Sequence, residues 1–147
     1  MSLILPRPNS DSIYYWFTPD SQFGLQIQKL YYHQVNMNRN GGNGEIVQAE
    51  QVLMDTSSER VTAVRHCNGR DWWIVGQHGY DERLFVWLMD TSGIHKQVHQ
   101  IYDPQFQRIK DNHLIAGYMK FSPDGNVLAE HNHCLLYTSP SPRDRTR

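Results

Sequence analysis

Two histidines are the side chains of this sequence best suited to bind a metal ion. His66 and His78 lie on either side of an Asn-Gly turn at 68–69, and Asp71 and Asp81 lie nearby in the sequence. Imidazole and carboxylate groups both bind zinc, so the two histidines with either aspartate make a weak candidate site. Three ligands at a metal-type spacing are not present. We therefore expect a polar or hydrogen-bonding role for both histidines, and the sequence predicts no metal and no cofactor.

Catalytic motifs are missing from the sequence. It contains neither Gly-x-Ser-x-Gly nor His-Glu-x-x-His, and no spacing of its carboxylates defines an acid–base pair. The glycine-rich loop at 40–44 resembles a phosphate-binding loop, but it lacks the Lys-Ser or Lys-Thr that would follow, so an inter-strand turn is expected there. The sequence thus favours a protein that is not an enzyme.

Pairs of adjacent aromatic residues occur at 14–15, 31–32 and 72–73. Neighbouring side chains of a strand point to opposite faces, so one ring of each pair should pack in a core and the other could be exposed. An exposed row of rings would suit a protein or glycan ligand. We therefore take Tyr15, Tyr32 and Trp73 as a possible binding surface.

Composition and charge exclude two classes of partner. Of the 147 residues 39% are hydrophobic and 12% aromatic, as in an ordinary globular protein rich in strands, and the net charge is −1. No basic stripe follows the chain, so nucleic acid is not an expected partner. No apolar run approaches the roughly 20 residues needed to cross a bilayer, so no membrane span is expected.

Short apolar runs between turn residues predict strands throughout, and no helical period persists. The Asn-Gly pair at 68–69 between two such runs is a strong hairpin signal. The predicted strands are 13–18, 26–37, 46–54, 60–66, 71–77, 84–89, 94–102, 117–121 and 126–130.

An internal repeat organises these strands. Turns at Asn9, Asn68 and Asp124 each precede an apolar strand, at spacings of about 59 and 56 positions. Four antiparallel strands per unit is the pattern of a β-propeller blade. We therefore predict an all-β, partial propeller over 1–133, with blades at about 1–56, 57–104 and a truncated 113–133. A β-sandwich is the alternative, although it does not require a repeat.

The last stretch, 134–147, reads like a translated sequencing adapter. Its residues from Cys134 to Asp144 match the codons of a transposon-end adapter continuously. We expect this tail to be non-native and disordered, with the natural reading frame interrupted near His133. A natural disordered tail rich in Ser, Pro and Arg is the alternative.

The chain also resembles a known family over nearly all of 2–130. The segments that carry the resemblance are 4–8 with 13–18, 31–37, 59–73 and 117–125, and the most specific is 59–73. They are similar to the propeller region, WD40-like or YVTN-like, of gliding-motility-associated surface proteins of Bacteroidota, which end in a type B sorting domain of type IX secretion. The resemblance implies an extracellular or outer-surface location, although neither an export signal nor the sorting domain lies in this sequence.

Two functions fit these expectations. The first is a non-catalytic interaction or scaffold module of a secreted or cell-surface protein, whose partners are an unidentified protein or glycan and the remaining blades of its own chain. The second is part of a secreted propeller enzyme, a polysaccharide hydrolase or lyase, whose active site is completed by blades outside 1–133. Because a repeat fold buries each unit against the next, we expect the isolated chain to aggregate or to be marginally folded.

Overall fold

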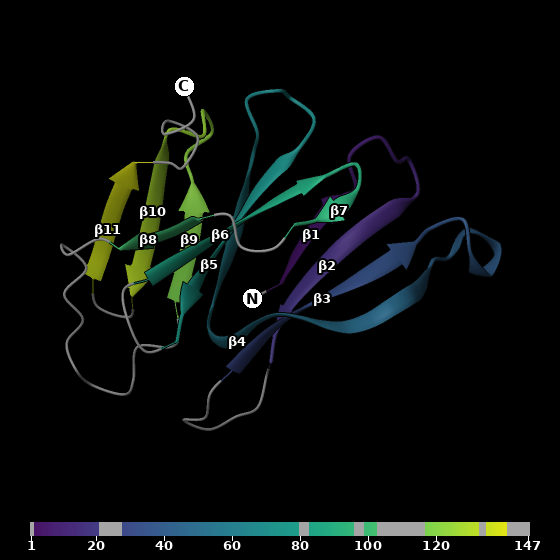
Figure 1. Cartoon of the computed structure of the whole chain (residues 1–147), viewed down its shortest axis with the longest axis horizontal. Helices are drawn as coiled ribbons and strands as arrows, with labels where there is room; N and C mark the ends of the chain where they lie inside the picture. The colour runs from purple at the N-terminus through teal and green to yellow at the C-terminus, as the bar shows by residue number, and fades with distance from the viewer. Residues whose placement is uncertain are drawn as a thin grey trace.

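The fold is all-β and antiparallel, as predicted, and consists of two sheets (Figure 1). A computed structural model describes residues 2–20, 28–79, 83–95, 99–102, 117–132 and 135–140. Helical structure in this part of the chain is limited to the 3-10 turn η1 (Asn40–Gly42). The described residues include no helix with the length and apolarity that a bilayer-spanning segment needs.

The larger sheet has eight strands that follow one another along the chain as an antiparallel meander. The strands β7 and β8 both pair with β6, at opposite ends of the same edge. The strands are β1 (Leu3–Pro6), β2 (Ile13–Pro19), β3 (Gln28–Asn36), β4 (Glu45–Arg65), β5 (Trp72–His78), β6 (Arg83–Asp90), β7 (Gly93–Ile94) and β8 (His99–Tyr102).

The strand β1 was not predicted from the sequence. It pairs with β2 from Leu3 opposite Phe17 to Pro6 opposite Tyr14. Its apolar run is short and ends in a proline, which weakens a strand prediction, but a proline is tolerated on an edge strand because no ladder hydrogen bond is needed on its outer side. The predicted strand at 94–102 is likewise divided in the structure, into β7 and β8.

The strand β4 is continuous where two strands, 46–54 and 60–66, were predicted. The polar stretch 55–59 suggested a loop, but Ser57 and Ser58 are buried and remain within the strand. The Ser57 hydroxyl donates to the Ser58 carbonyl at 2.7 Å, and the Ser58 hydroxyl accepts the Arg60 amide at 3.2 Å. These local bonds satisfy buried polar groups where the register with β5 is interrupted.

This irregularity divides the large sheet into two halves that pack on each other. The first part of β4 pairs with β3, and the part from Val61 onward pairs with β5. One hydrophobic core contains side chains from β1 to β6, among them Leu30, Val61 and Trp87. A Cβ atom at Gly76 would lie 3.3 Å from Leu30 and 3.1 Å from Trp87, so any side chain there would require these neighbours to shift by a few tenths of an ångström.

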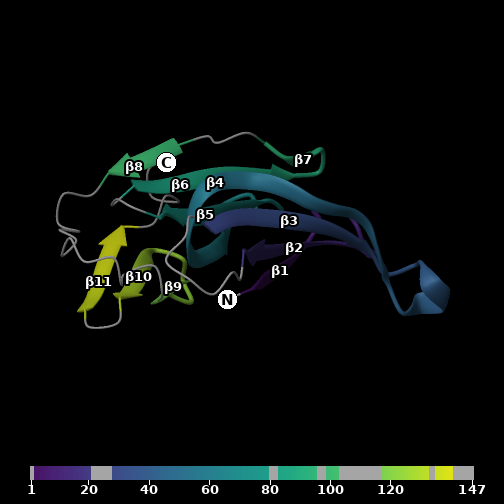
Figure 2. The same cartoon turned by 90° about the horizontal axis from the view of Figure 1, so that it is seen from below.

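The β3–β4 hairpin projects beyond the other strands as an arm (Figure 2). Its tip is the glycine-rich loop predicted to be a turn, and four of its residues have positive φ, namely Asn40, Gly41, Gly42 and Gly44. The prediction of an inter-strand turn rather than a phosphate loop is therefore confirmed in its geometry, since η1 spans only three residues.

A bulge in this arm is fixed by His33. Tyr32 pairs with Gln51 and Gln34 with Gln48, so residues 49 and 50 together lie opposite His33. Glu50 has a φ of 52° and its amide donates to His33 Nδ1 at 3.1 Å. The other ring nitrogen of His33 is 3.0 Å from the Thr18 hydroxyl. The imidazole thus links the bulge to β2.

The smaller sheet consists of β9 (Gly117–Phe121), β10 (Val127–Asn132) and β11 (Leu135–Pro140), with β10 in the centre. It lies beside β4–β6 in Figure 1, on the face opposite the first core. A second core fills this interface and includes Trp73, Val75, Val86, Met119 and Leu128. The strands β4–β6 therefore form a middle layer with a hydrophobic core on each face.

The strand β11 lies in the tail that was expected to be disordered. It pairs with β10 over its whole length, from Leu135 opposite Asn132 to Pro140 opposite Val127. The expectation of disorder is wrong for 135–140 in this structure. The physical reason is that the outer edge of β10 presents unpaired backbone groups, and the segment Leu-Leu-Tyr-Thr has the residue types that suit a strand.

A buried ion pair joins the two sheets. The Arg60 guanidinium on β4 donates to Glu130 Oε1 on β10 at 2.6 Å, and the exposed fractions of the two side chains are 0% and 4%. The same guanidinium nitrogen donates to Gln77 on β5. A Cβ atom at Gly117 would lie 2.5 Å from Arg60 Nε, so a glycine on β9 leaves room for the arginine.

We predict that removing one member of this pair destabilises the protein more than removing both. Glu130→Ala leaves a buried arginine without its carboxylate and should lower the free energy of unfolding by about 3 kcal/mol. The double variant Arg60→Met with Glu130→Leu should recover much of this loss, because neither buried charge then remains. Urea unfolding followed by circular dichroism measures both, with Glu45→Ala on the exposed arm as the control; equal losses for the single and double variants would contradict the prediction.

We also predict that the bulge depends on the imidazole. His33→Phe removes the acceptor of the Glu50 amide, so hydrogen exchange at that amide should accelerate by roughly tenfold. Thr18→Val is the matched control, because it removes only the partner of the other ring nitrogen. Unchanged protection of Glu50 in His33→Phe would show that the bulge does not need the histidine.

Candidate aromatic cavity

A cavity of about 400 Å³ opens between the two halves of the large sheet. Its described walls are contributed by β3, β4, β6 and β7 and by the residue that follows β7. This volume lies within the range of small-molecule sites in proteins. The lining residues are Tyr32, Val52, Leu53, Met54, Asp55, Phe85, Trp87, Ile94 and His95.

Aromatic rings from two strands form its walls. Phe85 and Trp87 are two residues apart on β6, so they share a face, and their rings lie 6.2 Å apart at an angle of 22°. Trp87 is only 3% exposed and belongs to the core beneath, whereas Phe85 is half-buried. Tyr32 stands on β3, where its ring packs edge-on against Tyr15 at 5.9 Å. The rings are thus held by packing rather than free to rotate.

Two polar side chains accompany these rings. Asp55 is 82% exposed, and Lys29 Nζ lies 3.9 Å from its carboxylate. His95 is 45% exposed and contacts Asp90, with His95 Nε2 2.7 Å from Asp90 Oδ2. The cavity therefore combines apolar rings with a carboxylate and an imidazole that solvent can reach.

The group Asp90, Ser92 and His95 has the residue types of a catalytic triad but not its geometry. The Ser92 hydroxyl donates to Asp90 Oδ1 at 2.6 Å and lies 3.3 Å from His95 Nε2, the same nitrogen that contacts Asp90. In a triad, serine and aspartate contact different nitrogens, so that the imidazole can take the serine proton. Here the three side chains close the turn between β6 and β7.

This turn lowers the pKa of Asp90 to about 2. The main cause is the hydrogen bond from the Ser92 hydroxyl, followed among the lowering causes by the bond from His95 and the Ser92 amide; partial burial opposes them. Hydrogen bonds and a nearby positive charge favour the ionised carboxylate. The Asp90 carboxylate that holds His95 at the wall of the cavity therefore remains ionised down to strongly acidic pH.

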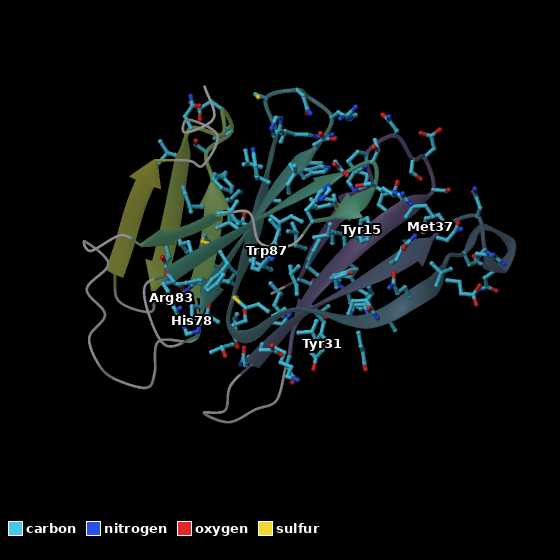
Figure 3. All side chains as sticks on the ribbon, viewed as in Figure 1. Tyr15, Tyr31, Met37, His78, Arg83 and Trp87 are labelled. Atoms are coloured by element: carbon cyan, nitrogen blue, oxygen red, sulfur yellow. The ribbon has the colours of Figure 1, made fainter. Side chains whose placement is uncertain are left out.

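The two histidines considered as metal ligands lie at opposite ends of the β4–β5 hairpin. The His66 amide donates to Asp71 at the turn, whereas His78 pairs with Ser57 at the other end, roughly 20 Å away at strand spacing. His66 packs on Trp73 at 5.3 Å, and Arg83 lies 3.2 Å from His78 Nε2 (Figure 3).

The described residues around these histidines do not gather into a metal-binding group. Groups of three or more potential ligands do not occur in the part of the chain that the structure describes. Asp81 lies outside the described residues, and the Asp71 carboxylate is held by Arg70 and Asn68. His66 lies at the turn end of the β4–β5 hairpin and His78 at its open end, so the hairpin does not bring the two side chains together.

Of the three rings proposed as a binding surface, only Tyr32 lines the cavity. Tyr15 and Trp73 are 6% and 4% exposed, so the proposal of an exposed row is wrong for these two. Tyr15 packs in the first core and Trp73 in the second. Trp73 is buried because β5 belongs to the middle layer, which is covered on both faces, and Tyr15 is buried because its side of β2 faces the first core.

Sequence reasoning missed the cavity residues Asp55, Phe85, Trp87 and His95. The alternation of Phe85 and Trp87 in an apolar run does indicate that they share a face. The approach of β6 to Asp55 has no local signal, because it depends on the course of β4 through the irregularity at 57–61.

We predict an acid-dependent loss of stability from Asp90. Its folded pKa lies below the unfolded value, so its contribution is present above about pH 4 and is lost as the pH falls towards 2. Asp90→Asn should therefore be less stable than the parent at neutral pH and equally stable near pH 2. Thermal unfolding between pH 2 and pH 7 measures this; a constant difference between the two proteins across that range would contradict it.

Comparisons with protein-family models, with curated proteins and with solved structures give no match for this chain. Its function is therefore argued from the cavity, the packing of its strands and the pattern of its sequence.

Proposed function

We propose that this chain is part of a β-propeller in an exported surface protein, where it serves as a non-catalytic interaction module. The arrangement of strands supports the propeller. Three successive antiparallel units, β1 to the first part of β4, the rest of β4 to β8, and the truncated unit with β9 and β10, pack with a hydrophobic core at each interface. Four-stranded sheets packed in this way are the building plan of a propeller.

The surface location is supported by the resemblance alone. The segment 59–73, its most specific part, forms the end of β4, the Asn-Gly turn and the start of β5. The strand residues of this segment belong to the middle layer, whereas the turn at 67–70 is exposed, so the likeness includes both interior packing and a surface turn. Type IX secretion and a sorting domain beyond this sequence are part of the same proposal.

The interaction role depends on one observation, the open cavity lined by Tyr32, Phe85 and Trp87. Concave sites with aromatic walls and a few polar groups are the usual form of a binding site. The residues that most resemble a catalytic triad, Asp90, Ser92 and His95, close a turn instead. The Ser92 hydroxyl donates its hydrogen bond to the Asp90 carboxylate, and His95 contacts the same carboxylate. This geometry favours binding without chemical change of the ligand.

A binding array tests the proposed role. We expect the 147-residue chain to be retained by at least one immobilised glycan or peptide, and mass spectrometry should show that ligand unaltered after elution. Phe85→Leu should reduce retention by roughly fivefold, because an aromatic contact is lost while apolar volume remains. Tyr118→Leu is the control, since this tyrosine on β9 is 68% exposed and lies outside the cavity.

Two results would contradict the proposal. A cleaved or otherwise altered ligand would favour the propeller enzyme instead. Retention that is the same in Phe85→Leu and in the parent would show that any binding occurs elsewhere on the chain.

A further inference from the structure

Aromatic side chains form one apolar wall of the cavity. Phe85 and Tyr32 are half-buried and line the cavity. Trp87 stacks on Phe85 from the core, and the Arg83 guanidinium lies over the Phe85 ring at 5.7 Å from its centre. The faces of aromatic rings are negative and their contacts with C–H groups, which carry partial positive charge, are favourable. One face of a pyranose ring is a patch of such C–H groups.

The polar groups of the cavity suit hydroxyls. The Asp55 carboxylate is an acceptor with several lone pairs, and the Tyr32 hydroxyl both donates and accepts. The His95 imidazole contacts Asp90 through Nε2, which leaves its other ring nitrogen on the opposite side of the ring. A ligand with an apolar face and a rim of hydroxyls matches this combination better than a purely apolar one.

The charges around the cavity disfavour ionic ligands. None of its described lining residues is Lys or Arg, but Lys29 Nζ lies 3.9 Å from the Asp55 carboxylate and the Arg83 guanidinium lies 5.7 Å from the centre of the Phe85 ring. The negative charge of Asp55 is therefore already offset, and neither sign of charge dominates. A quaternary ammonium could also use the aromatic rings. However, Lys29 already lies 3.9 Å from the one carboxylate that would balance such a cation. The remaining class is neutral and polar.

We infer that the cavity binds a neutral sugar ring, packed against the Phe85 and Tyr32 side chains and hydrogen-bonded to Asp55. This inference rests on the proposed interaction role and names its ligand class. The volume of about 400 Å³ and the open mouth allow the ring to be part of a longer neutral glycan.

Saturation-transfer NMR on the 147-residue chain tests the inference with three neutral probes, the methyl pyranosides of glucose, mannose and galactose. At least one should receive saturation, most strongly at the C–H protons of one ring face. Asp55→Ala should raise its Kd by roughly tenfold, as expected when a hydrogen bond to a charged group is lost. Because Asp55 is 82% exposed, this variant should remain folded; Glu45→Ala is the matched carboxylate control.

Charged probes complete the experiment. Saturation of tetramethylammonium or glucuronate but of no neutral pyranoside would overturn the inference, as would sugar binding that survives both Asp55→Ala and Phe85→Leu. If peptides bind in a Phe85-dependent way while sugars do not, the sugar inference fails and the interaction role stands. If nothing binds in a Phe85-dependent way, both fail.

Discussion

The buried pair of Arg60 and Glu130 is the interaction that constrains most tightly how the two sheets are joined. Two charges removed from water cost several kcal/mol each unless they meet in good geometry, so Glu130 on β10 must reach Arg60 on β4. Apolar side chains tolerate small shifts, whereas this ion pair does not. The bond from Arg60 to Gln77 ties the same guanidinium to β5, and Gly117 leaves the space that it occupies. One arginine thus fixes the positions of three strands beside the second core.

The middle layer explains why the strands need neighbours on both sides. In β5 the five central residues are buried, including Trp73 and Val75 towards the smaller sheet and Ile74 towards the first half of the larger one. A strand covered on both faces reads as a continuous apolar run. Each apolar face of β5 must be covered by another layer of strands. The stacking of the layers therefore follows from the apolar composition of β5 as much as from the ion pair between Arg60 and Glu130. The edges β1 and β11, by contrast, carry the prolines Pro6 and Pro140, which suit positions where pairing ends.

The sequence was sufficient for the class of fold and for most strands, because period-two alternation and the Asn-Gly turn at 68–69 act over short distances. It was insufficient where tertiary contacts decided the outcome. The serines of β4 suggested a loop, yet burial and local hydrogen bonds keep them in the strand. Tyr15 and Trp73 were expected at a surface because alternation does not show which face of β2 meets the first core or that β5 is covered on both faces. The cavity combines β3 with β6, and no local pattern records that approach.

The irregularity at 57–61 also accounts for the position of the cavity. Residues 52–55 line it immediately before β4 leaves β3 and begins its regular pairing with β5. Where one strand changes partners, the strands on either side diverge, and the side chains between them cannot all be covered. Tyr32 and Phe85 are the rings left half-buried by this divergence, while Trp87 beneath them remains in the core. The feature that misled the strand prediction, a run of polar residues inside β4, is therefore the feature that opens the candidate site.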